Sequence, residues 1–162
     1  MPKVKQQDRR RAFVETLNKL NDPKIVVIIP DVGFNYLDDP KNRFKVLNLG
    51  VTEASATMIA TSLALSGFKV FLYSMINFVL FRNYEMVRNG IVCHNAPVTL
   101  IGVKGSSAYR FLGFSHNLLH DEEDLRLCEN IGLEWKTPQT NNDVKWATIE
   151  SYKSNMPSYI RL

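Results

Sequence analysis

The fold is decided by the stretch Asn48-Leu49-Gly50-Val51-Thr52-Glu53, in which a strand ends and a helix begins. Residues 44–47 before it are mostly apolar, which predicts a buried strand. Residues 54–65 after it are small or apolar on nearly every face, which predicts a helix packed on all sides. Glu53 is therefore expected where the carboxyl end of a strand meets a helix, the position at which open α/β sheets bind ligands. The alternative is that Glu53 only complements the dipole of its helix, and spacing alone favours that simpler role.

The rest of the chain alternates apolar runs with helical spacings. Strands are predicted at 25–29, 69–73, 97–103, 133–136 and 158–162. Helices are predicted over 8–20, from 76 or 78 to 88, within 116–130, and from 140 or 142 to about 154. Turns, loops or short helices are expected at 30–34, 35–43 and 105–115. This alternation predicts a single α/β domain over residues 1–162, with a mainly parallel sheet covered by helices on both faces and a flexible basic arm at 1–7.

Length and composition are those of one globular domain. The chain has 162 residues, of which 45% are apolar and 22% are charged. The net charge of +4 is concentrated in the first eleven residues, which hold five basic side chains and one acidic side chain. Such an arm can bind nucleic acid or an acidic partner. No aromatic residues lie among these charges, so a solvated N-terminus is the favoured interpretation.

The sequence carries no signal for export or membrane insertion. Cys93 and Cys128 do not form a CxxC pair, which is ordinary for a reduced, cytoplasmic protein. No long apolar run follows the basic N-terminal residues, so no secretory signal is expected. The most apolar stretch, 70–81, is interrupted by Ser74 and Asn77 and is too short to span a bilayer. We therefore expect a cytoplasmic protein without membrane contact.

Several familiar site motifs are missing. Neither G-x-G-x-x-G nor G-x-x-x-x-G-K-[ST] occurs, which disfavours a self-sufficient nucleotide site, and the lack of G-x-S-x-G argues against an α/β-hydrolase. His116 and His120 are four residues apart and could share a helix face as a metal pair, with Asp121 and Glu122 nearby. The glutamate that zinc motifs place between their histidines is missing, so no metal site is predicted in this chain.

Six short motifs occur in the order in which transketolases carry them, and together they span almost the whole chain. Each motif is modest by itself, but their common register makes the resemblance specific. The residues that carry it are Arg11–Leu17, similar to the family's opening helix; Pro30–Phe34, its Asp-Leu-Gly turn; Gly50–Glu53, its Gly-(Ile/Val)-x-Glu stretch; Ser74–Asn89, its Phe-rich segment; Leu112–His116, its Gly-x-(Ser/Thr)-His loop; and Pro157–Leu162, its Pro-x-Tyr-Ile-Arg strand. The chain thus resembles the transketolase domain that binds the aminopyrimidine of thiamine diphosphate, which implies that domain's α/β fold.

The resemblance implies catalytic roles for Glu53 and His116. In thiamine enzymes, a carboxyl group placed like that of Glu53 hydrogen-bonds the pyrimidine ring nitrogen and favours the imino tautomer that activates the cofactor. The histidine that His116 resembles contacts the substrate and the reacting oxygens. Phe78 resembles the aromatic residue that stacks on the pyrimidine, and core packing is the simpler alternative for it.

Three more residues are implied to bind thiamine diphosphate: Phe81 and Met75 as walls of the same pocket, and Asp31 as an acid in a nearby turn. Met75 stands where many family members have phenylalanine, so it fills an apolar wall but stacks less well. Leu112 stands where transketolases that act on sugar phosphates often carry an acid that reads a substrate hydroxyl. This difference suggests another donor or acceptor substrate.

The motifs that bind the rest of the cofactor are missing from this chain. The family's Gly-Asp-Gly…Asn-Asn signature, which binds Mg²⁺ and diphosphate, is absent, since Asn141-Asn142 has no Gly-Asp-Gly before it. The chain also ends where the pyrimidine-binding domain ends. The resemblance therefore implies a separate diphosphate-binding subunit that supplies the Mg²⁺ ligands, in a heterotetramer that transfers a ketol or acyl unit from a sugar or keto substrate to an aldehyde. The alternative is a non-catalytic binding or regulatory module that keeps the fold, and a nucleic-acid-binding protein that uses the basic arm ranks third.

Overall fold

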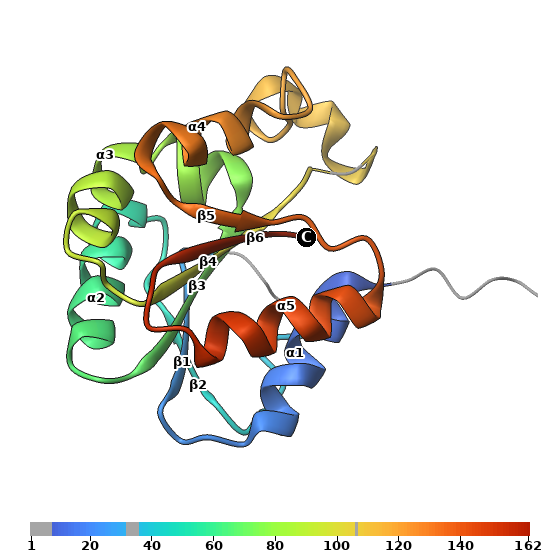
Figure 1. The fold of residues 1–162 in the computed structure, drawn as a ribbon. Coiled ribbons are helices and arrows are strands. Elements are labelled where there is room, and N and C mark those ends of the chain that lie inside the picture. The colour runs from blue at the N-terminus through green and yellow to red at the C-terminus, as the bar shows by residue number, and fades with distance from the viewer. Residues whose placement is uncertain (1–7, 32–35, 106) are drawn as a thin grey trace, which may run out of the picture.

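A computed structural model describes residues 8–31, 36–105 and 107–162. The predicted basic arm at 1–7 and most of the predicted turn at 30–34 lie outside these described residues. Six strands form one parallel sheet in the order β2-β1-β3-β4-β6-β5 (Figure 1). Their bounds are β1 Ile25–Ile29, β2 Lys45–Asn48, β3 Lys69–Met75, β4 Val98–Val103, β5 Glu134–Lys136 and β6 Ser158–Arg161. The predicted parallel α/β fold is confirmed.

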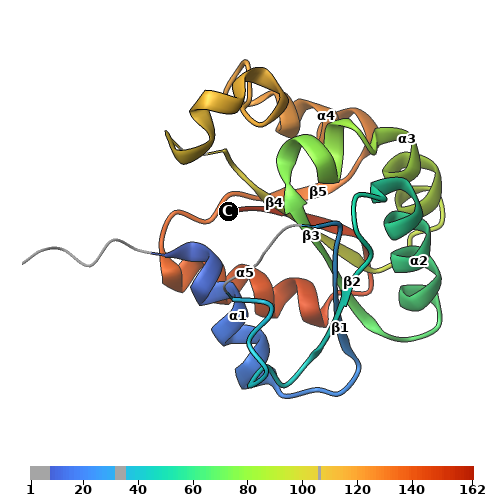
Figure 2. The ribbon, with the colours of Figure 1, turned by 180° about the vertical axis from the view of Figure 1, so that it is seen from behind.

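Helices cover both faces of the sheet, as the front and back views show (Figures 1 and 2). Two helices lie on one face, and the other helical segments pack on the opposite face or above the carboxyl edge. The two are α1 Arg9–Leu20 and α5 Asn141–Lys153; the others are α2 Glu53–Leu65, α3 Tyr84–Met86, α4 Glu123–Ile131, two π-helical segments η1 Asn77–Phe81 and η2 Val87–Val92, and the 3₁₀ segment η3 Ser107–Ser115. Among the described residues, no helix combines the length and the apolar character that crossing a bilayer requires.

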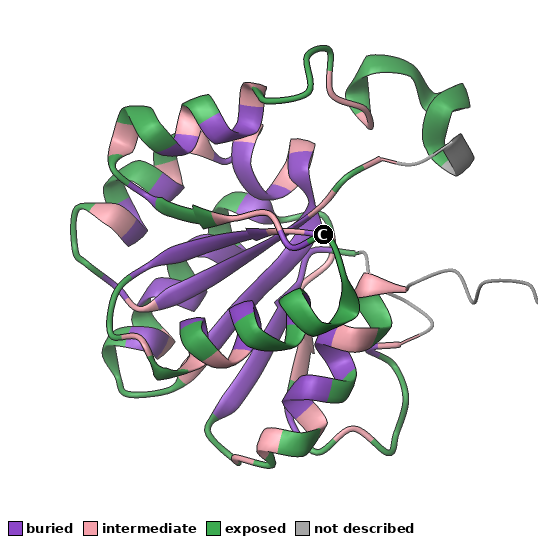
Figure 3. Ribbon diagram, turned by 45° about the vertical axis from the view of Figure 1, so that its right-hand side comes forward, coloured by how far each residue is buried: buried purple, intermediate pink, exposed green. Residues whose placement is uncertain are grey.

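Strand β1, which lies between β2 and β3, shows why the interior strands are buried on both sides. All five of its residues are buried, and their side chains alternate between two apolar cores. Val26 and Ile28 join the core beneath α2 and α4, whereas Ile25, Val27 and Ile29 join the core beneath α1 and α5. Figure 3 shows this distribution as buried residues along the sheet and on the inward sides of the helices. A continuous apolar run is the expected sequence of such a strand.

Polar side chains set the ends of the two helices on the α1–α5 face. The Asp8 carboxylate accepts a hydrogen bond from the backbone N–H of Arg11, and Asn21 ends α1 in a left-handed conformation. Thr140 and Asp143 form a reciprocal capping box at the start of α5. These caps confirm the predicted limits of both helices.

Two predictions about burial around Glu53 were wrong. Strand β2, predicted to be buried, is partly exposed because it is an edge strand with β1 as its neighbour on one side. Helix α2, predicted to be packed on all sides, buries the side that faces the sheet and exposes Met58, Ile59 and Leu65. Apolar character on every face of a helix does not reveal which faces find a partner within the same chain.

Two helical predictions also need correction. The helix predicted to run to Arg88, which Asn89-Gly90 could cap or Ile91 and Val92 could resume, continues through η2 to Val92. Residues 107–115, predicted as loop, form η3 with a break at Gly113. His116 and His120 lie in turns between η3 and α4 and do not share a helix face. The geometry considered for a histidine metal pair is therefore not present.

Gly102 of β4 allows a close contact that stabilises the sheet. A Cβ atom at this position would lie 2.5 Å from the hydroxyl oxygen of Tyr159, which donates a hydrogen bond of 2.7 Å to the buried Asp124 carboxylate. We predict that Gly102→Ala lowers the free energy of unfolding by about 1–3 kcal/mol, because Tyr159 must shift. Chemical denaturation measures this change.

The control is the same substitution in a Tyr159→Leu background, in which the clashing hydroxyl is gone. In that background, Gly102→Ala should lower the free energy of unfolding by clearly less, because the two positions are in contact and their effects are not additive. Equal costs of Gly102→Ala in both backgrounds would contradict this account.

Candidate functional site

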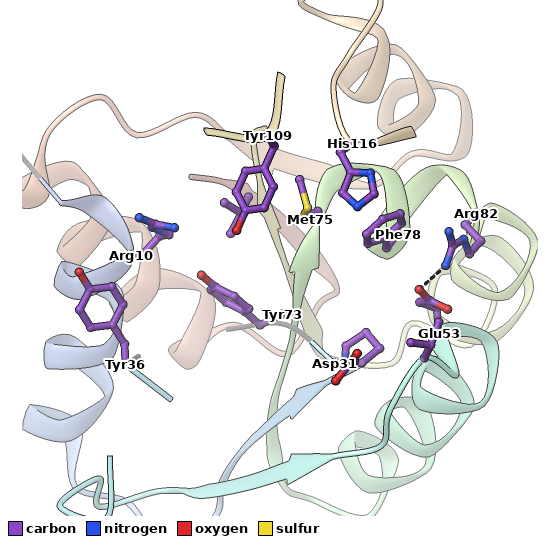
Figure 4. Close-up of a pocket in the computed structure, with 13 residues that line it drawn as sticks. Arg10, Asp31, Tyr36, Glu53, Tyr73, Met75, Phe78, Arg82, Tyr109 and His116 are labelled. Atoms are coloured by element: carbon purple, nitrogen blue, oxygen red, sulfur yellow. Dashed lines mark hydrogen bonds and ion pairs between the residues drawn. The ribbon is translucent and has the colours of Figure 1, made fainter. Parts of the chain in front are cut away.

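Residues that follow four neighbouring strands surround one cavity at the carboxyl edge of the sheet. The cavity has a volume of about 480 Å³ and is lined by residues from α1, the strand ends and the helical segments after them. Asp31 follows β1, Glu53 follows β2, Phe78 follows β3, and His116 follows β4 with its helical segment (Figure 4). Parallel strands deliver their carboxyl ends to the same edge, which is where such folds bind ligands. The structure thus brings together four of the residues selected from the sequence.

Glu53 is the first residue of α2 and lies at one end of this cavity. Its side chain is 7% exposed, and its Oε1 atom accepts a hydrogen bond of 2.7 Å from Nη1 of Arg82. Its backbone carbonyl accepts a hydrogen bond from the Thr57 hydroxyl one turn later. The prediction that Glu53 lies at the junction of a strand and a helix is confirmed, and a buried carboxylate at this place needs a partner for its charge.

Arg82 supplies that charge, and the sequence analysis missed it. The guanidinium carbon of Arg82 lies 4.3 Å from the centroid of the Phe78 ring, in a cation–π contact, while half of the side chain is exposed. Figure 4 shows Arg82, Phe78 and Glu53 grouped at the same end of the cavity. The signal in the sequence was a basic residue four positions after a candidate aromatic residue on a helix.

The wide turn of η1 explains why Arg82, and not Phe81, reaches the cavity. The backbone N–H of Arg82 donates to the carbonyl of Asn77, five residues earlier, as in a π-helix. The resemblance to the family motif implied that Phe81 lines the same pocket as Phe78, and in an α-helix residues three apart do share a face. The extra residue per turn rotates Phe81 away, and this half-buried side chain is not among the described residues that line the cavity.

His116 lies beside Phe78 and is held by its neighbours. The two rings meet edge to face with centroids 5.0 Å apart, and the ring of Tyr109 stacks on His116 at 6.4 Å. The Ser115 hydroxyl lies 2.9 Å from Nδ1 of His116. Asn77 donates from its amide to the backbone carbonyl of Phe114, which ties the histidine segment to η1.

The remaining predicted site residues differ in their surroundings. Met75 is buried at the end of β3 and lines the cavity. Asp31 is exposed, lines the cavity as well, and has a left-handed backbone with φ of 57°. Leu112 is partly exposed and is not among the described cavity-lining residues. Of the residues selected from the sequence, Met75 and Phe78 therefore contribute to the apolar lining, beside Val51 and Val103.

The end of the cavity opposite Glu53 is polar, which the sequence analysis also missed. Arg10 of α1, Tyr36, Tyr73 and Tyr109 line this end (Figure 4). Tyr36 donates its hydroxyl proton to the Asp8 carboxylate, and this hydrogen bond raises the pKa of Tyr36. Burial raises the pKa of Tyr73. These phenols stay neutral at physiological pH and can hydrogen-bond the oxygens of a polar ligand.

A second group of charges holds the segment that follows His116 against the sheet. Arg161 donates from Nη1 to the backbone carbonyl of Asp121 at 2.7 Å and to the Asp124 carboxylate at 3.0 Å. Lys104 at the end of β4 forms an ion pair with the Asp121 carboxylate. Gly105 lies so close to the backbone of His116 that a Cβ atom would collide with it. These contacts hold the segment around His116 close to the ends of β4 and β6.

A buried carboxylate, an aromatic ring and an imidazole at the carboxyl edge of a parallel sheet define a ligand-binding α/β domain. Residues 5–162 match the family model for the transketolase pyrimidine-binding domain. The chain therefore belongs to the transketolase family through this domain, and the resemblance found in the motifs is confirmed.

Individual relatives show how much of a larger protein the chain matches. It is 34% identical over 160 residues to a subunit of the apulose-4-phosphate transketolase of Phocaeicola vulgatus, covering 94% of this chain and 50% of that protein. A solved split-gene transketolase, an inactive β4 tetramer, aligns with a TM-score of 0.80 and 25% identity over 95% of this chain and 50% of its own. The transketolase of Campylobacter jejuni shares the fold with a TM-score of 0.77 and 18% identity, over 97% of this chain and 26% of that enzyme. The chain thus spans about half the length of the curated relative that it matches.

The pairing of Glu53 with Arg82 can be tested in the chain by itself. We predict that Arg82→Met lowers the free energy of unfolding by about 1–3 kcal/mol, because it leaves the buried Glu53 carboxylate without a partner. Adding Glu53→Gln to Arg82→Met should recover part of the loss, because the uncompensated charge is removed. Urea denaturation of the two single variants and the double variant measures this coupling.

Arg88→Met is the matched control, because Arg88 lies on η2 and is exposed. It should change the free energy of unfolding by no more than about 0.5 kcal/mol. Strictly additive effects of the substitutions at 53 and 82 would show that the two side chains do not interact in solution.

Proposed function

We propose that this chain is the pyrimidine-binding part of a two-component, thiamine-diphosphate-dependent transketolase-like enzyme. A separate diphosphate-binding subunit provides the ligands for Mg²⁺ and diphosphate, and the two kinds of subunit form a heterotetramer. The enzyme transfers a ketol or acyl unit from a sugar or keto donor to an aldehyde acceptor. The observation that carries the proposal is the buried Glu53 carboxylate beside the Phe78 ring at the carboxyl edge of the sheet.

The residues present fit an aminopyrimidine. Glu53 offers a carboxylate that can hydrogen-bond a ring nitrogen, and Phe78 and Met75 offer an apolar wall for a flat ring. When bound, thiamine diphosphate supplies the nucleophilic carbon that carries the transferred unit. Glu53 holds the proton shared with the ring nitrogen, in a site where burial excludes water from that hydrogen bond.

In this proposal, His116 contacts the substrate. The contact between the Ser115 hydroxyl and Nδ1 orients the imidazole, so Nε2 is the nitrogen that exchanges a hydrogen bond with a substrate oxygen. Arg10, Tyr36 and Tyr109 at the polar end can hydrogen-bond the hydroxyl groups of a sugar or keto substrate. Acidic groups are few at this end, which is consistent with Leu112 standing in place of an acid that reads a hydroxyl.

Exposed apolar side chains near the cavity support a covering subunit. Val51, which lines the cavity, is 65% exposed, Phe114 beside η1 is 77% exposed, and Phe111 is 82% exposed. Large apolar groups clustered at a site mark surfaces that another molecule covers. Among the described residues, no three His, Cys, Asp or Glu side chains gather as metal ligands would. The proposal assigns the Mg²⁺ ligands to the partner because the family's Gly-Asp-Gly…Asn-Asn signature does not occur in this sequence.

The names of two relatives add support for a divided enzyme. One relative is named as a single subunit of a transketolase, and another is a split-gene transketolase. The runner-up is a non-catalytic binding or regulatory module with the same fold. It is favoured by Leu112, which replaces an acid that family members use on their substrates.

The first test is ketol transfer after mixing this protein with a candidate diphosphate-binding subunit, thiamine diphosphate and Mg²⁺. Activity should appear only on mixing, and Glu53→Gln should lower kcat by about 100-fold or more, because the amide cannot hold the shared proton. Glu15→Gln, at an exposed acid of α1, is the control and should keep full activity. No gain on mixing would reject the catalytic proposal in favour of the non-catalytic module.

The second test concerns the surface near the cavity. Phe111→Glu should weaken association with the diphosphate-binding subunit about tenfold or more, because a charge would be buried at an apolar contact. Trp146→Glu alters an equally apolar exposed residue on α5, across the sheet, and should leave association unchanged. Calorimetric titration measures both. Equal effects of the two substitutions would place the interface elsewhere.

A further inference from the structure

The guanidinium group of Arg82 makes two contacts at once. It donates a hydrogen bond of 2.7 Å to the Glu53 carboxylate, and it lies 4.3 Å from the centroid of the Phe78 ring. A guanidinium is flat, carries N–H donors in its plane and stacks on aromatic faces. The proposed function gives the same two contacts, a hydrogen bond to Glu53 and stacking on Phe78, to the aminopyrimidine ring.

We propose that Arg82 is an internal placeholder for the aminopyrimidine. In the free chain its guanidinium satisfies Glu53 and Phe78, and it moves away when the pyrimidine ring takes over both contacts. This inference rests on the proposed function and adds to it a gating residue that controls how readily the cofactor enters. Arg82 then lowers cofactor affinity in exchange for keeping Glu53 paired in the free chain.

The surroundings of Arg82 allow such a movement. Half of the Arg82 side chain is exposed, so its charged end can turn into solvent without losing hydration. Glu53, in contrast, is 7% exposed, and its carboxylate lines the cavity from the first turn of α2. The partner that leaves is therefore Arg82.

The backbone beside Arg82 is anchored, so the side chain can move alone. Asn83 is buried and donates from its amide to the Thr57 hydroxyl of α2. The hydrogen bond from the Arg82 N–H to the Asn77 carbonyl holds the wide turn of η1. Such π turns inside helices are frequent at functional sites. Displacement of the guanidinium then leaves Phe78 and Glu53 in position for the incoming ring.

Titration of the isolated chain with thiamine, and with the aminopyrimidine fragment of thiamine, tests the proposal. Protein NMR detects binding even at millimolar dissociation constants, so half a site is sufficient. Arg82→Met should bind both ligands at least fivefold more tightly than the unaltered chain, because no side chain competes for Glu53 and Phe78. Arg88→Met, at an exposed arginine of η2, should bind as the unaltered chain does.

A second variant is needed because Arg82→Met is expected to be less stable than the unaltered chain. Arg82→Lys keeps the positive charge but loses the flat, stacking group, and it should bind the ligands with intermediate affinity. Affinity equal to that of the unaltered chain in both variants would overturn the placeholder. Lower affinity in both would overturn it as well and would show that Arg82 supports the bound ring. The gain should also vanish when Glu53→Gln is added to Arg82→Met.

The same titration separates this inference from the proposed function. Binding that depends on Glu53 but not on Arg82 would overturn the placeholder and leave the pyrimidine site intact. If no variant binds either ligand in a way that depends on Glu53, the proposed pyrimidine site is rejected, and the placeholder with it. The expected result is tighter binding in Arg82→Met that is lost again in the double variant.

Discussion

All six strands of the sheet run parallel, and this constraint determines where the site forms. Parallel neighbours need a crossover between them, so every strand delivers its carboxyl end to the same edge. Four residues far apart in sequence, Asp31, Glu53, Phe78 and His116, meet there because each follows the end of a strand or the segment after it. The buried, β-branched strand β1 contributes to this arrangement, since its side chains pack against helices on both faces of the sheet.

Two buried acids in this chain are paired with arginine. Glu53 pairs with Arg82 across the cavity, and Asp124, which is fully buried, pairs with Arg161 and accepts a further hydrogen bond from Tyr159. A buried carboxylate without such partners would destabilise the fold by several kcal/mol, which is the order of the desolvation penalty of an ion. The two pairs differ in exposure. The Arg161 side chain is mostly buried, whereas that of Arg82 is half exposed, and the proposed exchange of Glu53 for solvent requires this exposure.

Large apolar side chains are exposed on α2 and around η3. Helix α2 exposes Met58 and Ile59, and the segment around η3 exposes Phe111 and Phe114. A monomer gains nothing from large apolar groups in water, whereas a surface shared between subunits does. In the proposed function, this surface contacts the diphosphate-binding subunit, and the chain matches half of a relative that is named as one subunit of a transketolase.

The sequence by itself determined the local parts of this protein. It predicted the strands near their observed bounds, the limits of α1 and α5, and the position of Glu53 between β2 and α2, because apolar period and capping chemistry act over a few residues. Its ordered motifs also identified the family.

Only the tertiary structure decided which of these parts meet. Strand order made β2 an exposed edge, and one additional residue in the turn of η1 brought Arg82 to Glu53 and moved Phe81 away. Arg10 and Tyr36 reached the cavity from segments that no motif connects with it. Such contacts depend on packing between segments distant in the chain, and hydrophobic patterns carry no information about which distant neighbour a side chain will meet.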